Sequence, residues 1–258
     1  MKKSSRKLLA LCLSASLCAP LFFGCGTNEK KTISTEAVAE TESSESVQKE
    51  TGQAVEQTDV FVEPVDGISD DFIRGMDASA VLSVENSGAK YYGYDGTEQD
   101  VFKTLAESGV NYIRLRVWND PYDENGNGYG GGNNDVAAAI TLGKRATQYG
   151  MKVCIDFHYS DFWADPKRQH APKAWEGMTA DEKADALYDF TKESLTAILD
   201  AGVDVGMVQV GNETTGGFIG ETNVRNMCVL FSAGAAGVKT YNPDVKVVIH
   251  VESPHKGT

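Results

Sequence analysis

The sequence has few cysteines, and their positions exclude a disulfide scaffold. Of 5 cysteines in 258 residues, Cys12, Cys18 and Cys25 lie close to the amino terminus. Cys154 falls in an apolar strand pattern and Cys228 in a helical one. Disulfide-rich secreted domains need paired cysteines throughout the folded part. We therefore expect Cys154 and Cys228 to be small buried hydrophobic residues, and we expect no metal site.

Positive charge is also scarce. The sequence has 24 Lys and Arg against 37 Asp and Glu, a formal net charge of −13. Removal of Lys2, Lys3, Arg6 and Lys7 with a cleaved leader would take this charge to −17. A chain this acidic is not a nucleic-acid binder, and it favours a neutral or cationic substrate over an anionic one.

Long apolar runs are missing except near the amino terminus. The run at 8–23 follows those four cations and is short for a permanent transmembrane helix. It leads to Gly24 and Cys25, a pattern that resembles a bacterial lipoprotein signal. We expect residues 1–25 to be the signal, with Cys25 lipidated as the mature amino terminus on a membrane-anchored cell-surface protein. The alternative is an ordinary secretory peptide and a secreted protein.

The stretch 26–65 has few aliphatic residues between its charges and is rich in Glu, Ser and Thr. Such a segment cannot bury enough apolar surface to offset its chain entropy. We therefore predict a flexible, disordered linker that separates the signal from a folded domain at 66–258.

Strand-like and helix-like patterns alternate through this domain, which indicates a parallel α/β fold. Gly109, Gly150 and Gly202 each occupy the place of a glycine that ends a helix before a strand. Thr179–Glu182 is a capping box, and Thr97 with Asp100 is expected to open the first helix. The predicted strands are 73–78, 112–118, 152–158, 205–211 and 246–251.

Polar side chains distinguish between the two folds that fit this alternation. They cluster at the carboxyl ends of several strands: Arg116 and Trp118, Asp156 and His158, Asn212 and Glu213, and His250. A doubly wound dinucleotide fold concentrates its chemistry at one switch point, whereas a barrel assembles a site from many strand ends. We therefore predict a (β/α)8 TIM barrel, incomplete here, with about five strands present.

The loop after the second strand contains two misleading motifs. Gly126–Gly131 matches a dinucleotide fingerprint, but its strand ends well upstream near Trp118. Asp123 opens a calcium-like loop whose twelfth position is Asn134 rather than glutamate. We interpret the segment as a long surface loop near the substrate cleft.

The chemistry centres on Glu213, which ends a buried apolar strand. A carboxyl there is costly unless it is paired or functional, and desolvation can make it a proton donor. The alternative is a loop glutamate that caps the next helix. Asn212 can donate its amide to a sugar hydroxyl. Arg116 is expected to face a carboxylate of the active site; the alternative is a buried ion pair that only stabilises the barrel. Arg114 points to the same face, and we favour Arg116 because it lies nearer the catalytic rim of the barrel.

Three motifs extend this interpretation. The segments 113–123, 156–166 and 210–213 closely resemble the second-, third- and fourth-strand signatures of the endo-β-1,4-galactanases, glycoside hydrolase family 53. The last segment is followed by Gly216 and Gly217, as in that signature. The resemblance runs from about residue 73 to the end.

The resemblance implies a retaining hydrolase with Glu213 as general acid/base, assisted by Asn212 and Arg116. It also implies five substrate-binding residues: Trp118, Asp156, His158, Trp163 and His250. The alternatives are packing roles for the two tryptophans and an indirect role for His250.

One part of the pattern is not found. A retaining enzyme needs a second carboxyl about 5–5.5 Å from the first. The resemblance places this nucleophile after a seventh strand, beyond Thr258, and we do not assign the role to Glu252. We therefore expect residues 26–258 alone to be poorly stable and inactive, because strand edges would be unpaired. Measured galactan hydrolysis by that fragment would contradict this. No cofactor is expected, although relatives can carry calcium in later loops.

The predicted function is endo-hydrolysis of β-1,4-galactosidic linkages in plant cell-wall galactan or pectic arabinogalactan, by a monomer held to the membrane through its lipid. One alternative is another retaining β-glycanase of the same clan. The other is a non-catalytic surface glycan-binding protein.

Overall fold

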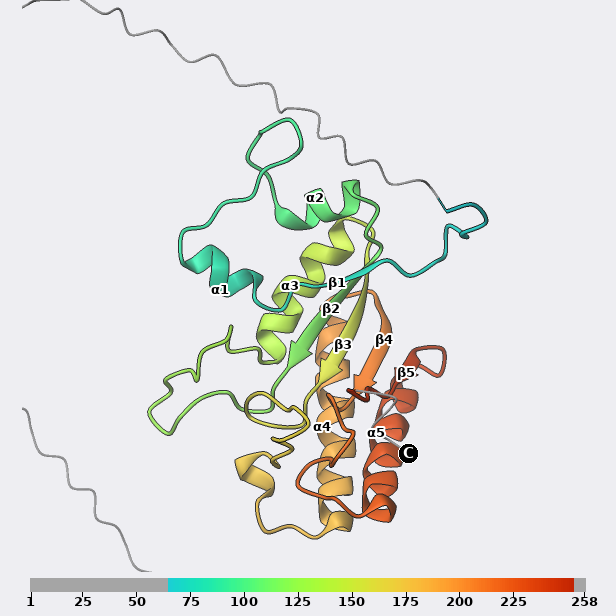
Figure 1. Ribbon diagram of the computed structural model, residues 1–258. Coiled ribbons are helices and arrows are strands. Elements are labelled where there is room, and N and C mark those ends of the chain that lie inside the picture. Colours follow the sequence, from blue (N-terminus) through green and yellow to red (C-terminus); the bar gives the residue numbers. More distant parts are fainter. Residues whose placement is uncertain (1–64, 253–258) are drawn as a thin grey trace, which may run out of the picture. The chain divides into compact units, whose positions relative to one another are not determined.

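The computed structural model describes residues 65–252 (Figure 1). The predicted signal, Cys25 and nearly all of the predicted linker lie outside the described residues. Among residues 65–252, none of the helices has the length and apolar character needed to cross a bilayer.

Five parallel strands form one sheet in chain order, β1-β2-β3-β4-β5. Their bounds are Gly75–Asp77, Tyr112–Val117, Lys152–Phe157, Val205–Val210 and Lys246–Val248. The order never reverses, as in a (β/α) barrel, whereas a doubly wound sheet has a switch point. The five predicted strands are confirmed, but β1 and β5 are shorter than predicted. Each of them pairs on one side only within the described residues.

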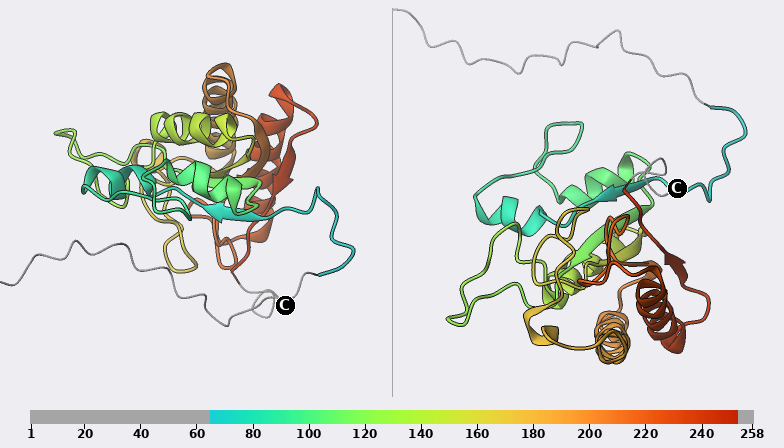
Figure 2. Two further views of the ribbon diagram at one scale, coloured as in Figure 1. Left: turned by 90° about the horizontal axis from the view of Figure 1, so that it is seen from above. Right: turned by 60° about the horizontal axis from the view of Figure 1, so that its bottom comes forward.

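Helices follow the strands and lie against one face of the sheet (Figures 1 and 2). In chain order they are α1 Val81–Asn86, α2 Val101–Glu107, α3 Val136–Gln148, the 3-10 turn η1 Lys173–Trp175, α4 Ala180–Asp200 and α5 Val224–Tyr241. Helix α1 was not predicted. The predicted start of α2 is corrected, because Asp100 alone caps it by accepting the Phe102 amide at 2.8 Å.

Local signals in the sequence account for where these helices begin and end. The capping box of α4 is confirmed, since the Thr179 and Glu182 side chains each bond the other's backbone amide. Gly109, Gly150 and Gly202 have φ angles of 84°, 76° and 87°. These are left-handed conformations that glycine adopts without strain, so the predicted helix ends are confirmed.

The two faces of the sheet differ in chemistry, as the alternation of side chains along a strand requires. In β2, Ile113, Leu115 and Val117 are buried and join the apolar core with the helices. Arg114 and Arg116 point to the opposite face, which is the inner face of the barrel wall. The same alternation in β3 and β4 places further polar side chains there, and so creates a polar site at the strand ends.

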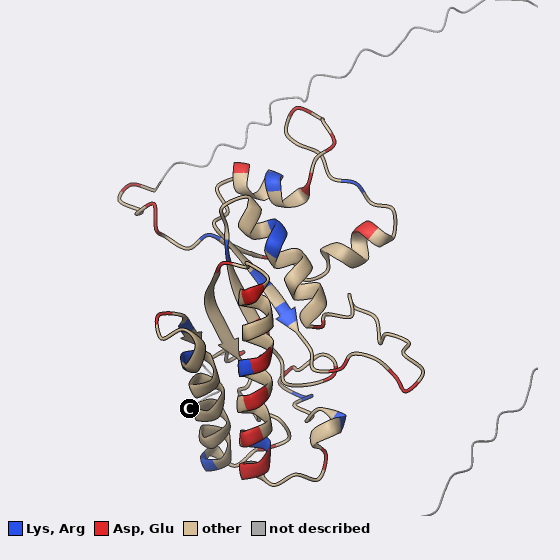
Figure 3. Cartoon of the chain, turned by 180° about the vertical axis from the view of Figure 1, so that it is seen from behind, with Lys and Arg blue, Asp and Glu red and all other residues tan. Residues whose placement is uncertain are grey.

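The outer surface of the domain carries a run of acidic side chains on α4. A stripe of carboxylates runs along the exposed side of α4 (Figure 3). Its members are Asp181, Glu182, Asp185, Asp189 and Glu193. The basic side chains Arg114 and Arg116 lie instead on the inner face.

The two cysteines of the domain have different environments. Cys154 is buried in β3, as predicted, and burial, with the nearby Asp156 carboxylate, raises the pKa of its thiol to about 12. The prediction that Cys228 is buried was wrong, because α5 exposes this side chain to solvent.

Candidate active site

Arg114 lies at the centre of a polar network on the inner face. Its guanidinium is 2.6 Å from Asp77 Oδ2 of β1 and 2.6 Å from Asp156 Oδ2 of β3. It also donates to Gln209 Oε1 of β4 at 3.2 Å and to Asn212 Oδ1 at 2.9 Å. One side chain on β2 therefore ties β1, β3 and β4 to the residue that precedes Glu213.

Asp156 and His158 are held in this network below the surface. Both side chains are wholly buried, with His158 Nε2 3.1 Å from Asp156 Oδ2. His158 Nδ1 accepts from Trp118 Nε1 at 3.2 Å and from the Ala164 amide at 3.1 Å. Because Nδ1 accepts two hydrogen bonds, the proton lies on Nε2 and points at Asp156. In this geometry both residues orient neighbouring groups, and their predicted contact with a sugar stays a prediction.

Asn212 is oriented by bonds at both ends of its amide. Its Nδ2 donates to the Ala164 carbonyl at 2.8 Å, and its Oδ1 lies 2.9 Å from His250 Nδ1. The side chain is buried at 5 % exposure. One Nδ2 hydrogen is thus used, and the predicted donation to a sugar hydroxyl would come from the second Nδ2 hydrogen.

Glu213 stands apart from this network through its side chain. It is half-buried, and its carboxylate makes no hydrogen bond or ion pair with any residue in 65–252. Its backbone is left-handed, with φ 50°. A carboxyl beside a fully bonded cluster but without a partner of its own is available to a ligand.

Arg116 does not meet the expected carboxylate. Among residues 65–252 no ion pair to it forms, and its buried Nε has no hydrogen-bond partner. Its guanidinium instead stacks on the Trp163 ring at 3.9 Å from the centroid. Among residues 65–252 the ion pair with Asp156 is made by Arg114, and the expected carboxylate contact of Arg116 stays a prediction. Burial lowers the pKa of Arg116.

The two tryptophans have different roles. Trp118 has no exposed surface and packs against Phe162 and Trp163, with centroids 4.9 and 5.8 Å away. Phe162 and Trp163 cover the Trp118 ring, as its alternative packing role requires, and the predicted stacking of Trp118 on a sugar stays a prediction. Trp163 is 36 % exposed, which leaves surface for a ligand.

His250 reaches the cluster from the end of β5. Its Nδ1 lies 2.9 Å from Asn212 Oδ1 and 3.3 Å from the Glu213 amide nitrogen. Nδ1 can serve only one of them at a time, and the shorter contact favours donation to Asn212. His250 Nε2 has no partner among the described residues and remains available.

The long loop between β2 and α3 uses its polar groups internally. The Asp123 carboxylate accepts from the backbone amides of Asn125 and Asn127 and from the Asn127 side chain, at 2.8 to 2.9 Å. No cluster of three or more His, Cys, Asp or Glu suited to a metal occurs among residues 65–252.

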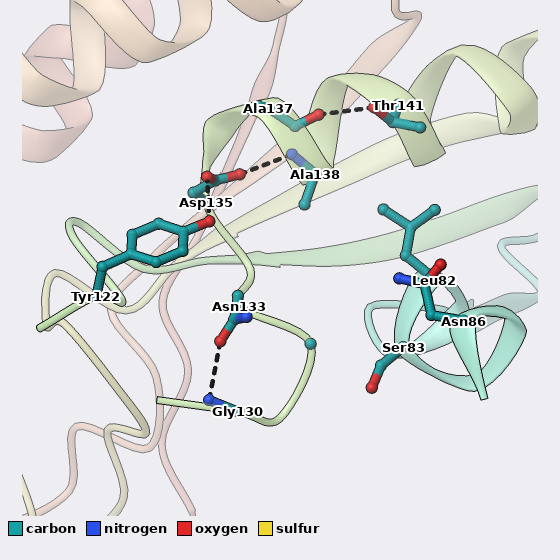
Figure 4. Close-up of a pocket in the computed structure, with 11 residues that line it drawn as sticks. Leu82, Ser83, Asn86, Tyr122, Gly130, Asn133, Asp135, Ala137, Ala138 and Thr141 are labelled. Atoms are coloured by element: carbon teal, nitrogen blue, oxygen red, sulfur yellow. Dashed lines mark hydrogen bonds between the residues drawn. The ribbon is translucent and has the colours of Figure 1, made fainter. Parts of the chain in front are cut away.

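A separate hollow of about 400 Å³ lies between this loop, α1 and the first turns of α3 (Figure 4). There the Tyr122 hydroxyl donates to Asp135, and Asp135 caps α3 by accepting the Ala138 amide, both at 2.8 Å. None of the predicted site residues lines it, so it is distinct from the strand-end cluster.

Sequence reasoning missed three members of the cluster. Asp77 and Gln209 could have been found from the sequence, because each is a polar residue in an otherwise apolar strand. Gln169 gives no such signal, since it lies in an irregular loop and meets the site only through the fold.

The sequence model described as "Glycosyl hydrolase family 53" matches residues 73–258. The chain belongs to this family. It is 56% identical over 196 residues to the endo-β-1,4-galactanase of Bacillus subtilis strain 168, covering 76% of this chain and 46% of that protein. It is 37% identical over 186 residues to the arabinogalactan endo-β-1,4-galactanase of Humicola insolens, covering 70% and 53%.

Solved structures of family 53 agree with the fold. The catalytic domain from Ignisphaera aggregans superposes with a TM-score of 0.72 at 43% identity, over 74% of this chain and 54% of that one. A fungal β-1,4-galactanase gives 0.64 at 36% identity, over 70% and 53%. The predicted partial (β/α) barrel is therefore confirmed. The chain spans about half the length of the relatives it matches.

Proposed function

We propose that the protein is an arabinogalactan endo-β-1,4-galactanase that retains anomeric configuration, with Glu213 as its general acid/base. The observation that carries the proposal is the Glu213 carboxyl, half-buried at the strand ends and without a partner among residues 65–252. A carboxyl in that setting can protonate a departing sugar oxygen and later activate water. The names of the family 53 relatives support the substrate.

The second carboxyl of a retaining mechanism has no assigned residue here. No strand beyond β5 lies among the described residues. Arg116 supports the proposal indirectly, because its buried guanidinium has no carboxylate partner there. We infer that this cation faces the nucleophile or the charge that develops on the sugar.

Product analysis tests the substrate assignment. The gene product that contains this sequence is incubated with β-1,4-galactan, mannan and xylan, and released oligosaccharides are measured. We expect galacto-oligosaccharides from galactan and little release from the others. Release from mannan or xylan instead would favour another retaining glycanase, and binding of galactan without release would favour a non-catalytic glycan-binding protein.

Trp163 is the proposed stacking surface for a galactose ring. Trp163→Ala in the gene product should raise the KM for galactan about 5- to 10-fold, because a lost aromatic contact is worth about 1 kcal/mol. The kcat should change less. Tyr92→Ala, on the exposed loop between α1 and α2, is the matched control and should leave both constants unchanged. An unchanged KM in Trp163→Ala would remove this residue from the substrate site.

The proposals on export and membrane anchoring concern residues that lie outside 65–252. We infer that Cys25 is lipidated and holds the enzyme at the bacterial surface. Cys25→Ser should move the protein from the detergent phase of a Triton X-114 extract to the aqueous phase or culture medium. Equal partitioning of both forms would favour an ordinary secretory peptide.

A further inference from the structure

The backbone at Glu213 is held in a conformation that it would not readily adopt alone. Its φ is 50°, which costs a residue with a side chain about 1 kcal/mol or more. The direction of the Glu213 carboxyl depends on this backbone conformation. Contacts that hold the backbone therefore control where the carboxyl lies.

Gln169 supplies such a contact from a different loop. Its Nε2 donates to the Asn212 carbonyl at 2.8 Å and lies 3.4 Å from the Glu213 carbonyl. The same nitrogen lies 3.1 Å from the Asp165 carbonyl within its own loop. One side-chain amide thus joins the loop after β3 to the peptide units on both sides of Glu213.

The rest of the loop reinforces this connection. The Ala164 carbonyl accepts from Asn212 Nδ2 at 2.8 Å, and the Ala164 amide donates to His158 at 3.1 Å. The Gly220 amide donates to the Gln169 carbonyl. The segment 164–169 is therefore attached at one end to the buried His158 and at the other to both sides of the Glu213 loop.

The loop that carries Gln169 is itself braced. The amides of Asp165 and Arg168 each donate to the other's carbonyl at 3.0 Å, and Arg168 Nε donates to Asp165 Oδ2 at 2.7 Å. A tight turn of this kind fixes where the next side chain begins. Gln169 therefore reaches Asn212 from a defined position.

We propose that Gln169 is a positioning residue for the general acid, which sets the Glu213 carboxyl against the departing sugar oxygen. The inference rests on the proposed function of Glu213. A general acid must lie within hydrogen-bond reach of the atom it protonates, and a misplacement of about 1 Å can cost about 100-fold in rate. The Gln169 amide nitrogen bonds backbone carbonyls of the Glu213 loop and of its own loop, so its loss should affect proton donation more than binding.

Substrates whose leaving groups differ in acidity distinguish a loss of proton donation from a general loss of activity. Galactan departs as a sugar alkoxide and needs a proton, whereas a dinitrophenolate departs without one. The proposal therefore predicts that a Gln169 variant loses activity selectively on galactan. A role confined to folding or binding would lower both activities together.

The experiment compares Gln169→Met, which keeps the length but removes the donor, with Gln99→Met in the full gene product. Gln99 is a matched control because it also donates side-chain hydrogen bonds, to Thr104 and Glu107, on another loop. For Gln169→Met we expect kcat on galactan to fall about 10- to 100-fold with little change in KM. The kcat/KM for a dinitrophenyl β-1,4-galactobioside should fall less than about threefold. Gln99→Met should match the wild type on both substrates.

Two outcomes count against the inference. Equal losses on both substrates, or no loss on galactan, would overturn it. Should Gln169→Met fail to fold by circular dichroism, Gln169→Ala is measured in the same ratio and the same criteria apply. Glu213→Gln is run alongside: if it lacks the selective loss on galactan the proposed function fails, and if it alone shows that loss only the role of Gln169 fails.

Discussion

Glu213→Gln is expected to lower kcat on galactan about 10²- to 10⁴-fold in the gene product, the largest kinetic effect of any substitution considered. The amide keeps the size of the side chain but cannot supply a proton to the glycosidic oxygen. Because the carboxylate has no partner among residues 65–252, its loss breaks no contact described there. The midpoint of thermal unfolding should therefore stay within a few degrees of the wild type.

Glu176→Gln is the control for that result. Glu176 is another loop glutamate, exposed and next to η1, and it makes no described side-chain contact. It should retain full activity. Activity of Glu213→Gln within threefold of the wild type would remove Glu213 from the chemistry and favour its alternative role as a loop residue before α5.

Arg114→Met should cause the largest loss of stability, about 3–5 kcal/mol in the free energy of unfolding. The substitution leaves Asp156, which has no exposed side-chain surface, without its 2.6 Å cation partner. It also removes hydrogen bonds to Gln209 and Asn212. Urea unfolding, followed by tryptophan fluorescence, measures the effect.

Arg74→Met is the matched control for Arg114. Arg74 is exposed and donates to the Gly109 carbonyl at 2.7 Å, and no carboxylate among residues 65–252 pairs with it. Its loss should cost about 1 kcal/mol or less. A loss for Arg114→Met as small as that of Arg74→Met would show that the network does not stabilise the barrel wall.

Arg114→Met should also change how the free energy of unfolding depends on pH. Burial would raise the pKa of Asp77, but hydrogen bonds from Ser79 and the Arg114 guanidinium outweigh it and hold the pKa below its usual value. A depressed folded-state pKa contributes stability above the unfolded value of 3.8, and this is lost as the pH falls below it. Arg114→Met should reduce that acid-dependent loss.

The fold could be predicted because its signals are local. Ile113, Leu115 and Val117 alternate with polar residues, and Gly109, Gly150 and Gly202 mark helix ends that the structure confirms. The strand order and the absence of a reversal followed from polar residues at several strand ends. Helix α1 was missed because its six residues carry no side-chain cap.

The site could be predicted only as a set of residues, because its contacts depend on side-chain reach. Arg114 and Arg116 share one face of β2, and no sequence pattern indicates which guanidinium meets Asp156. Trp118 and Trp163 both looked like stacking surfaces, yet the loop that carries Phe162 covers Trp118. Gln169 reaches Asn212 across 43 positions of sequence, a contact that only the folded loops create.

Azide trapping tests the central claim most directly. Glu213→Ala in the gene product is given a dinitrophenyl β-1,4-galactobioside with sodium azide, and the anomeric configuration of the product is read by NMR. Azide needs no general base, so it should displace the enzyme carboxylate and restore turnover, yielding a β-galactobiosyl azide. An α-configured azide would contradict retention, and hydrolysis at the wild-type rate without azide would contradict the role of Glu213.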